Sequence, residues 1–180
     1  PKDQVTDRQS AIDVRLGRSF SLVRPWAEGV AELVTDSAES TSEPPLEQIV
    51  LDYGEPLTVH PHQFVFARTL EFVRLPRDLM AYVVGRSSWG RRGLIVATAV
   101  IVHPGFTGPI TLEIKNVGEV PVALYPFDRI AQLSFHRAEG VSATSEARSQ
   151  FASSFAPTLG TVRDPETALR IQRLVKAKGR

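Results

Sequence analysis

The chain has 180 residues, of which 42% are hydrophobic and 23% are charged, and its formal net charge is +1. This composition fits one globular domain, and so small a net charge gives no bulk field to attract nucleic acid or an anionic membrane. There are no cysteines, which excludes disulfides, thiolate chemistry and cysteine-ligated zinc. No apolar run approaches the roughly 18 residues of a membrane helix and no signal peptide is visible, so we expect a soluble cytoplasmic protein.

The N-terminal quarter predicts a pair of strands followed by a surface excursion. Residues 11–17 alternate apolar and polar side chains, which is typical of a half-buried strand, and residues 20–23 are predicted to be its hairpin partner. Residues 28–47 are acidic, rich in serine and threonine, and contain two consecutive prolines. We interpret this segment as a surface excursion because its composition cannot contribute much to a core.

From residue 49 onward the chain predicts a series of short strands. Their ranges are 49–53, 57–60, 63–67, 70–75, 79–84, 120–124 and 130–136. Strands of this length, separated by proline, glycine and aspartate, favour a β-barrel or sandwich over alternating strands and helices. The 13 prolines agree with many turns and edge strands. The predicted fold class is therefore all-β.

One helix is predicted, at the C-terminus. Asp164 and Pro165 supply an N-cap and a first-turn proline, and an apolar stripe follows between residues 169 and 175. We expect this helix to pack on the barrel or on a neighbouring subunit. The chain is accordingly divided into a barrel domain over residues 1–160 and a helical tail over residues 161–180.

Residues 85–116 contain the candidate chemistry. Residues 85–88 (Gly-Arg-Ser-Ser) offer backbone N–H groups, two hydroxyls and a guanidinium to phosphate oxygens, although they fit an ordinary turn equally well. Residues 98–102 could form a hairpin arm whose backbone reads the edge of a base. The sequence alone favours the simpler interpretation, which is a core strand that ends in a turn at residues 103–105.

Glu113 interrupts an apolar strand, with Leu112 and Ile114 on the opposite face. Buried carboxylates are rare unless they are paired, so Arg91 or Arg92 is a candidate partner that would keep Glu113 ionised. Burial itself would raise the pKa of Glu113 toward the range that suits a general base. A solvent-facing glutamate on a one-sided strand explains the same alternation.

Taken together, these segments resemble the dCTP deaminase branch of the dUTPase-like superfamily. The similarity lies in the family's GRSSxxRxGL, Thr-Ala, Asp-Pro-Gly and Gly-x-Ile-x-Leu-Glu runs, which correspond to residues 85–94, 98–99, 102–106 and 108–113. Residues 12–17, 69–76 and 129–135 resemble the family's Asp-Val-Arg-Leu-Gly, Thr-Leu-Glu and Gln-Leu runs. The similarity covers most of residues 11–160.

This resemblance implies a distorted dUTPase-like β-barrel, a homotrimer with active sites between subunits, and hydrolysis of dCTP to dUTP and ammonia. It implies that Glu113 activates the attacking water, and that Ser87 and Arg91 position this water and support the charge of Glu113. The substrate-binding positions it implies are Arg86 and Ser88 for phosphates, Thr98, Ala99 and Val100 for the base, His103 and Phe106 for the deoxyribose, and Gln132. It implies no protein-bound metal or cofactor, since Mg²⁺ arrives with the triphosphate, and neither a nucleic acid polymer nor a membrane as partner.

Three positions depart from the family pattern. His103 replaces the aspartate before Pro-Gly, which argues against triphosphate cleavage more strongly than against deamination. The segment before Thr98 is one residue shorter and lacks the family histidine, and residues 150–158 keep little of the family's phosphate-binding tail. A dUTPase or bifunctional dUMP-forming enzyme, and a non-catalytic nucleotide-binding protein, therefore remain alternatives. We interpret His60 and His62 as a surface pair and not as metal ligands.

Overall fold

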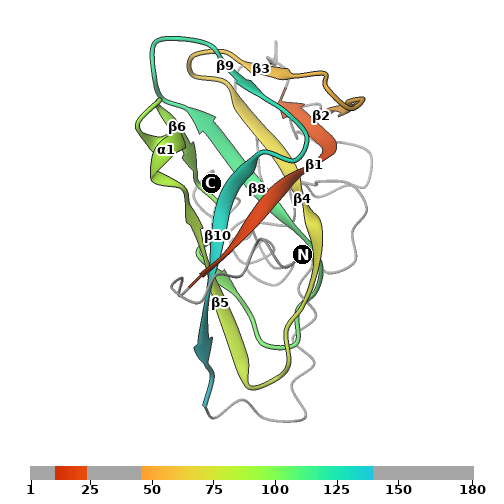
Figure 1. Cartoon of the computed structure of the whole chain (residues 1–180), viewed down its shortest axis with the longest axis vertical. Helices are drawn as coiled ribbons and strands as arrows, with labels where there is room; N and C mark the ends of the chain where they lie inside the picture. Colours follow the sequence, from red (N-terminus) through yellow and green to blue (C-terminus); the bar gives the residue numbers. More distant parts are fainter. Residues whose placement is uncertain (1–10, 24–45, 140–180) are drawn as a thin grey trace, which may run out of the picture.

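The computed structural model describes residues 11–23 and 46–139, which fold into strands with one short helix (Figure 1). The elements are β1 (Ala11–Val23), β2 (Leu46–Val50), β3 (Leu57–Val59), β4 (Phe64–Arg74), β5 (Leu79–Gly85), α1 (Ser87–Gly90), β6 (Leu94–Val96), β7 (Ile101–Val102), β8 (Thr107–Asn116), β9 (Val122–Leu124) and β10 (Arg129–Arg137). The predicted all-β class is confirmed. The predicted C-terminal helix, the domain boundary at residue 160, the tail at residues 150–158 and nearly all of the predicted excursion lie outside the described residues.

Eight strands form one curled antiparallel sheet, in the order β6-β8-β4-β1-β10-β5-β7, with β2 also paired to β1. The curl depends on β1, whose first half pairs with β10 and whose second half pairs with β4 and β2. Figure 1 shows β1 crossing the molecule diagonally between β10 and β4. Strands β3 and β9 form a separate two-stranded sheet. The arrangement agrees with the distorted barrel that the family resemblance implies.

Two predicted strand boundaries are wrong for the same physical reason. Residues 11–23 form one strand and not a hairpin, and residues 64–74 likewise form one strand and not two. Both strands have a register shift in the middle, which interrupts the alternation of buried and exposed side chains. At this crossing a Cβ on Gly17 would lie 3.1 Å from the Arg68 carbonyl oxygen, so glycine permits the close approach.

The core is formed by the side chains that point into the curled sheet. Alternate residues of β8 are buried, and they include Ile110, Leu112 and Ile114. At the end of this strand the fully buried Asn116 donates from Nδ2 to the carbonyl oxygens of Val59 and Val120, both at 2.9 Å. These bonds attach the end of β8 to β3 and to the turn that leads into β9. As a result β8, which contains Glu113, is held along its inner face and at one end.

Several predicted strands match the structure to within a few residues, at 57–60, 79–84, 120–124 and 130–136. The strand predicted at 49–53 lies three residues earlier, and of residues 98–102 only Ile101 and Val102 form a strand. No helix within the described part of the chain has both the length and the apolar composition needed to span a bilayer.

Candidate active site

Glu113 lies on the outward face of β8, with the buried side chains of Leu112 and Ile114 on the other face, as the alternation predicts. Its side chain is half-buried, and this burial raises the pKa of the Glu113 carboxyl above the ordinary value of a glutamate. Glu113 forms no ion pair with any described residue. A raised pKa moves this carboxyl group toward the range that suits a general base.

Residues 97 and 98 lie directly beside Glu113. The backbone N–H of Glu113 donates to Thr98 Oγ1 at 2.6 Å, and the N–H of Ala97 donates to the Glu113 carbonyl oxygen at 2.6 Å. The next residue, Ala99, is exposed, and its backbone makes no hydrogen bond within the described part of the chain. The Val100 carbonyl oxygen is already used, because it accepts the N–H of Val83 at 2.8 Å. Within the segment predicted to read the base, the exposed Ala99 therefore has both backbone groups unbonded.

The Gly-Arg-Ser-Ser segment leaves β5 at Gly85 and forms the short helix α1. Ser87, Ser88 and Arg91 are exposed on it. Two bonds attach the segment to β10: the Arg86 N–H donates to the Ile130 carbonyl oxygen at 3.2 Å, and the Trp89 indole Nε1 donates to the Arg129 carbonyl oxygen at 2.8 Å. The hydroxyls of Ser87 and Ser88 therefore lie on a segment that β10 holds in place.

The predicted contact of Glu113 with this segment is wrong for the single chain. Neither Arg91 nor Arg92 forms an ion pair with Glu113, and Ser87 forms no hydrogen bond with it. Arg92 instead donates from Nη1 to the Ser88 carbonyl oxygen at 2.7 Å. The hydrogen bonds of this segment are made to β10 and within the segment itself, although α1 also contacts β6, which pairs with β8.

Sequence reasoning missed a charged cluster centred on Asp13. The Asp13 side chain on β1 is 4% exposed and accepts hydrogen bonds from Arg86 Nη1 and, at 2.8 Å, from Gln132 Nε2. Arg129 Nη1 lies 3.6 Å from the same carboxylate. Arg86 and Gln132 were both predicted from the resemblance, but Asp13 and Arg129 were not. The available signal was Asp13 itself, a carboxylate in a strand whose neighbours are apolar.

Arg68 was also missed. On the paired strands β4 and β8 it lies opposite Thr111, on the same outward face as Glu113 and two residues further along. It is 9% exposed, and burial lowers the pKa of its guanidinium. The sequence gives no sign of this, because an arginine at the end of a predicted strand is expected to be exposed.

The remaining predicted positions lie in two turns, the one before β8 and the one between β3 and β4. His103 is exposed, and its carbonyl oxygen accepts the N–H of Phe106 at 3.1 Å. The Phe106 ring is half-buried and packs against the core, so only part of it is available to a sugar. His60 and His62 are exposed in the β3–β4 turn, and no group of three potential metal ligands occurs among the described residues.

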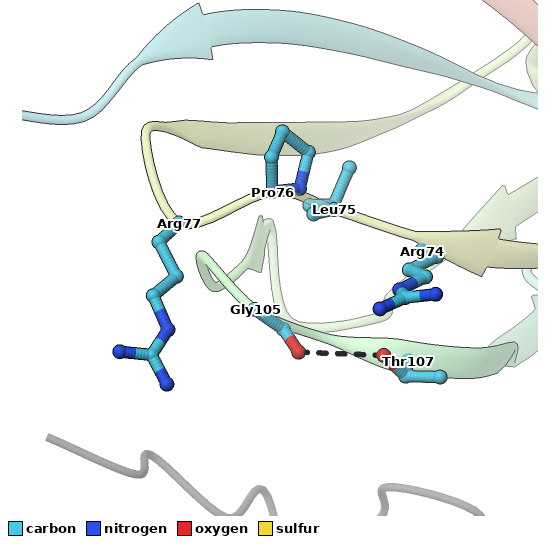
Figure 2. A pocket seen from close by; sticks show the side chains of 6 residues that line it. All are labelled: Arg74, Leu75, Pro76, Arg77, Gly105 and Thr107. Atoms are coloured by element: carbon cyan, nitrogen blue, oxygen red, sulfur yellow. Dashed lines mark hydrogen bonds between the residues drawn. The ribbon is translucent and has the colours of Figure 1, made fainter. Parts of the chain in front are cut away.

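A cavity of about 410 Å³ lies at the start of β8 (Figure 2). Its lining residues are Arg74, Leu75, Pro76, Arg77, Gly105 and Thr107. Glu113 is six residues beyond Thr107 along the extended strand, a distance of roughly 20 Å. No predicted site residue lines this cavity, and it is separate from the candidate active site.

Comparison with known proteins agrees with the architecture. The family model described as dCTP deaminase-like matches residues 1–138. A dCTP deaminase, dUMP-forming, from Dictyoglomus thermophilum is 46% identical over 138 residues, which is 76% of this chain and 68% of the relative. A protein of the same name from Methanobrevibacter smithii is 42% identical over 139 residues, covering 74% of this chain and 68% of the relative.

Among solved structures, the 2′-deoxycytidine 5′-triphosphate deaminase from Agrobacterium tumefaciens matches 77% of this chain with a TM-score of 0.56. The identity is 21%, so this match shows the fold alone, and the present chain spans 41% of that longer chain. The fold and the family that the sequence motifs predict are therefore confirmed. This chain belongs to the dCTP deaminase-like family.

Proposed function

We propose that this chain hydrolyses the 4-amino group of the cytosine in dCTP, with Glu113 as the general base. The observation that carries the proposal is the position of Glu113 beside the Thr98–Ala99 pair, joined by the bond from the Glu113 N–H to Thr98 Oγ1 at 2.6 Å. A carboxyl group with a raised pKa thus adjoins the exposed backbone of Ala99, which can pair with the edge of a base. Family membership and the names of the relatives support the same reaction.

The proposed steps balance without a redox partner. Ionised Glu113 takes a proton from water while the water oxygen bonds to C4, and it passes this proton to N3 of the ring as the tetrahedral intermediate forms. Glu113 then takes the proton of the new C4 hydroxyl and delivers it to the 4-amino nitrogen. The C4–N bond breaks, ammonia leaves, and the C4 oxygen becomes the uracil carbonyl. The chain has no cysteine, so it cannot contain the H-x-E and P-C-x-x-C signature of zinc deaminases.

We further propose that the protein is a homotrimer in which a neighbouring subunit supplies Ser87 and Arg91 to each Glu113. Within one chain these residues are exposed and do not contact Glu113. A general base and a guanidinium that do not pair within one chain can form one site when two copies meet. Mg²⁺ as the triphosphate complex and a cytoplasmic location remain predictions.

The dUMP-forming reaction is the second candidate. It is favoured by the names of the two relatives above, which are dUMP-forming deaminases. His103 is the observation against it, because a neutral imidazole is a poorer acceptor than the aspartate that the resemblance leads us to expect. The two candidates share the deamination step and differ only in whether dUTP or dUMP plus pyrophosphate is released.

One incubation tests both candidates. The purified protein is mixed with dCTP, dCMP or dUTP in the presence of Mg²⁺, and ammonia and pyrophosphate are measured in parallel. Ammonia without pyrophosphate from dCTP supports the first candidate, whereas equal amounts of both support the second. If no cytosine nucleotide releases ammonia but dCTP raises the melting temperature, the chain binds nucleotide without turnover and the proposal is wrong.

A further inference from the structure

Strand β6 ends beside Glu113 in an incomplete pair. The residues Leu94–Val96 pair with β8 in regular register, and in this register Ala97 comes next, opposite Glu113. In an antiparallel ladder, two residues of a hydrogen-bonded pair exchange two bonds, one from each N–H to the other carbonyl oxygen. Here one of the two is present, because the Ala97 N–H donates to the Glu113 carbonyl oxygen at 2.6 Å.

A side chain takes the place of the second bond. The Glu113 N–H donates to Thr98 Oγ1 at 2.6 Å, where a regular ladder would use the Ala97 carbonyl oxygen. That carbonyl oxygen accepts no hydrogen bond within the described part of the chain. A threonine hydroxyl that bonds to nearby backbone competes with the sheet ladder in this way. Thr98 therefore ends the pairing of β6 with β8 at the position of Glu113.

Beyond this point the two chain segments separate, and both keep unpaired backbone groups. The N–H and C=O groups of Glu113 face β6, so by the alternation of a strand those of Thr111 face the same side. Among the described strands, β6 is the one that pairs with this side of β8, and its pairing stops at Val96. A continued ladder would place Ala99 opposite Thr111. Two backbone edges thus lie next to Glu113 without being paired to each other.

Such edges suit a planar partner that has hydrogen-bonding groups along its own rim. A strand edge with free N–H and C=O groups is a template for pairing, and a pyrimidine base offers both donors and acceptors at its edge. If the ladder continued, Ala99 and Thr111 would bond to each other, and their backbone groups would be lost to the base. The Thr98 hydroxyl prevents this closure. Its bond to the Glu113 N–H also fixes the base-reading segment relative to the general base.

We propose that Thr98 is a positioning residue. Its hydroxyl takes the place of the Ala97 carbonyl oxygen on the Glu113 N–H, and in this way it keeps residues 98–100 open to the base. The inference rests on the proposed function for the identity of the base and for the role of Glu113. The side chain acts through the backbone and does not need to touch the substrate.

The main variant is Thr98→Val, because valine has nearly the same shape, favours strands and cannot accept a hydrogen bond. Without the hydroxyl, we expect the Ala97 carbonyl oxygen to accept the Glu113 N–H and β6 to extend to Ala99. Amide hydrogen exchange should show that the Glu113 N–H stays protected while the N–H groups of Ala99 and Thr111 become protected. The melting temperature should stay the same or rise, since the lost bond is replaced. Thr98→Ser keeps the hydroxyl and should retain the exchange pattern of the wild-type protein.

Binding is measured by calorimetry in the Glu113→Gln background, where no turnover is expected, with dCTP plus Mg²⁺ and with deoxycytidine as probes. Thr98→Val should weaken both probes by about tenfold or more and by the same factor, because they share the base and a displaced binding segment loses affinity steeply. In chains that retain Glu113, the same variant should lower kcat for ammonia release by about tenfold or more, and Thr98→Ser should restore it. Thr58→Val is the matched control, since it changes an exposed threonine on the separate sheet of β3 and β9.

Unchanged binding and kcat in Thr98→Val would overturn the inference, because the hydroxyl would then not hold the segment open. A lower melting temperature with loss of protection at the Glu113 N–H would show that Thr98 only stabilises the strand. Equal losses in Thr98→Ser and Thr98→Val would show that the hydroxyl is not the cause. A wild-type chain that binds dCTP but releases no ammonia would refute the proposed function alone, since exchange and binding still test Thr98. A wild-type chain that binds neither probe would overturn both.

Discussion

Asp13 and Glu113 are both carboxylates on long central strands, but their surroundings differ. Asp13 is nearly inaccessible and is surrounded by donors: Arg86, Gln132 and, at 3.6 Å, Arg129. Glu113 is half-buried on the outward face of β8, and no described cation pairs with it. The comparison shows that Asp13 belongs to the hydrogen-bonded framework of the sheet. Glu113, in contrast, is accessible for chemistry.

The difference follows from the neighbouring strands. Asp13 faces β10, whose opposite residue Gln132 is a donor and whose first residue is Arg129. Glu113 faces Phe66 across β4, and an aromatic ring removes water without replacing its hydrogen bonds. Desolvation is therefore the cause of the raised pKa of Glu113. Glu113 is therefore the carboxylate that is available for proton transfer, whereas the Asp13 carboxylate accepts two hydrogen bonds.

The largest expected effect comes from removing the available carboxylate. Glu113→Gln should lower the rate of ammonia release from dCTP by about a thousandfold, within the usual range for a general base. Glu119→Gln, an exposed glutamate just beyond β8, is the matched control and should retain full activity. If Glu113→Gln releases ammonia as fast as the wild-type protein, Glu113 is not the general base.

The next test concerns the Arg91 guanidinium, which we propose comes from a second subunit. Arg91→Gln should reduce ammonia release by about a hundredfold, because a charge that stabilises the transition state is lost. If two such inactive variants, Arg91→Gln and Glu113→Gln, are co-expressed in equal amounts, random trimers should recover about a quarter of the wild-type activity. No recovery in mixed trimers of confirmed composition would show that both residues act within one chain, and would contradict the trimeric site.

A third carboxylate can be introduced to sharpen the comparison. His103→Asp restores the acidic residue that the family resemblance leads us to expect, at an exposed turn where the fold should tolerate it. We expect pyrophosphate release from dCTP to rise by about tenfold while ammonia release changes little, since a charged acceptor orients water better than neutral imidazole. Pyrophosphate and ammonia are measured on the same samples. No change in pyrophosphate would show that position 103 does not control this step.

The pH dependence of kcat/KM tests the assignment of Glu113 as the base. The base must be ionised, so activity should be lost as the pH falls through the raised pKa of Glu113. The acidic limb should therefore lie above the ordinary glutamate range, and Arg91→Gln should move it higher by removing a nearby positive charge. A limb at or below the ordinary range in the wild-type protein would contradict the assignment.

The smallest expected effect is on stability. The folded chain binds a proton at Glu113 more tightly than the unfolded chain, so this group favours folding below the unfolded pKa and loses that contribution as the pH rises through the folded pKa. Glu113→Gln should therefore raise the free energy of unfolding at pH 8 by less than about 1 kcal/mol, since solvent screens this half-buried group. The gain should vanish at pH 4. Urea unfolding at both pH values is the measurement, and Asp13→Asn should destabilise the protein at pH 8 instead.

The local pattern of apolar and polar residues was sufficient to predict much of the fold. Periodicity predicted the all-β class, the positions of most strands, and the face of β8 on which Glu113 lies, because alternation along a strand reports which side chains are buried. The two long strands were predicted as four because a register shift at Gly17 and Arg68 breaks that alternation. Spacing and residue type together were specific enough to identify the family from residues 85–113.

Only the tertiary structure determined which charged and polar side chains contact each other. Asp13 and Gln132 are 119 positions apart, and they become neighbours because β1 and β10 pair in one register. The predicted pairing of Glu113 with Arg91 or Arg92 was wrong within the chain, although α1 contacts β6 and β6 pairs with β8, because neighbouring elements do not by themselves bring two side chains together. Periodicity acts over a few residues, whereas ion pairs depend on strand order and register, which are set by the folding of the whole sheet.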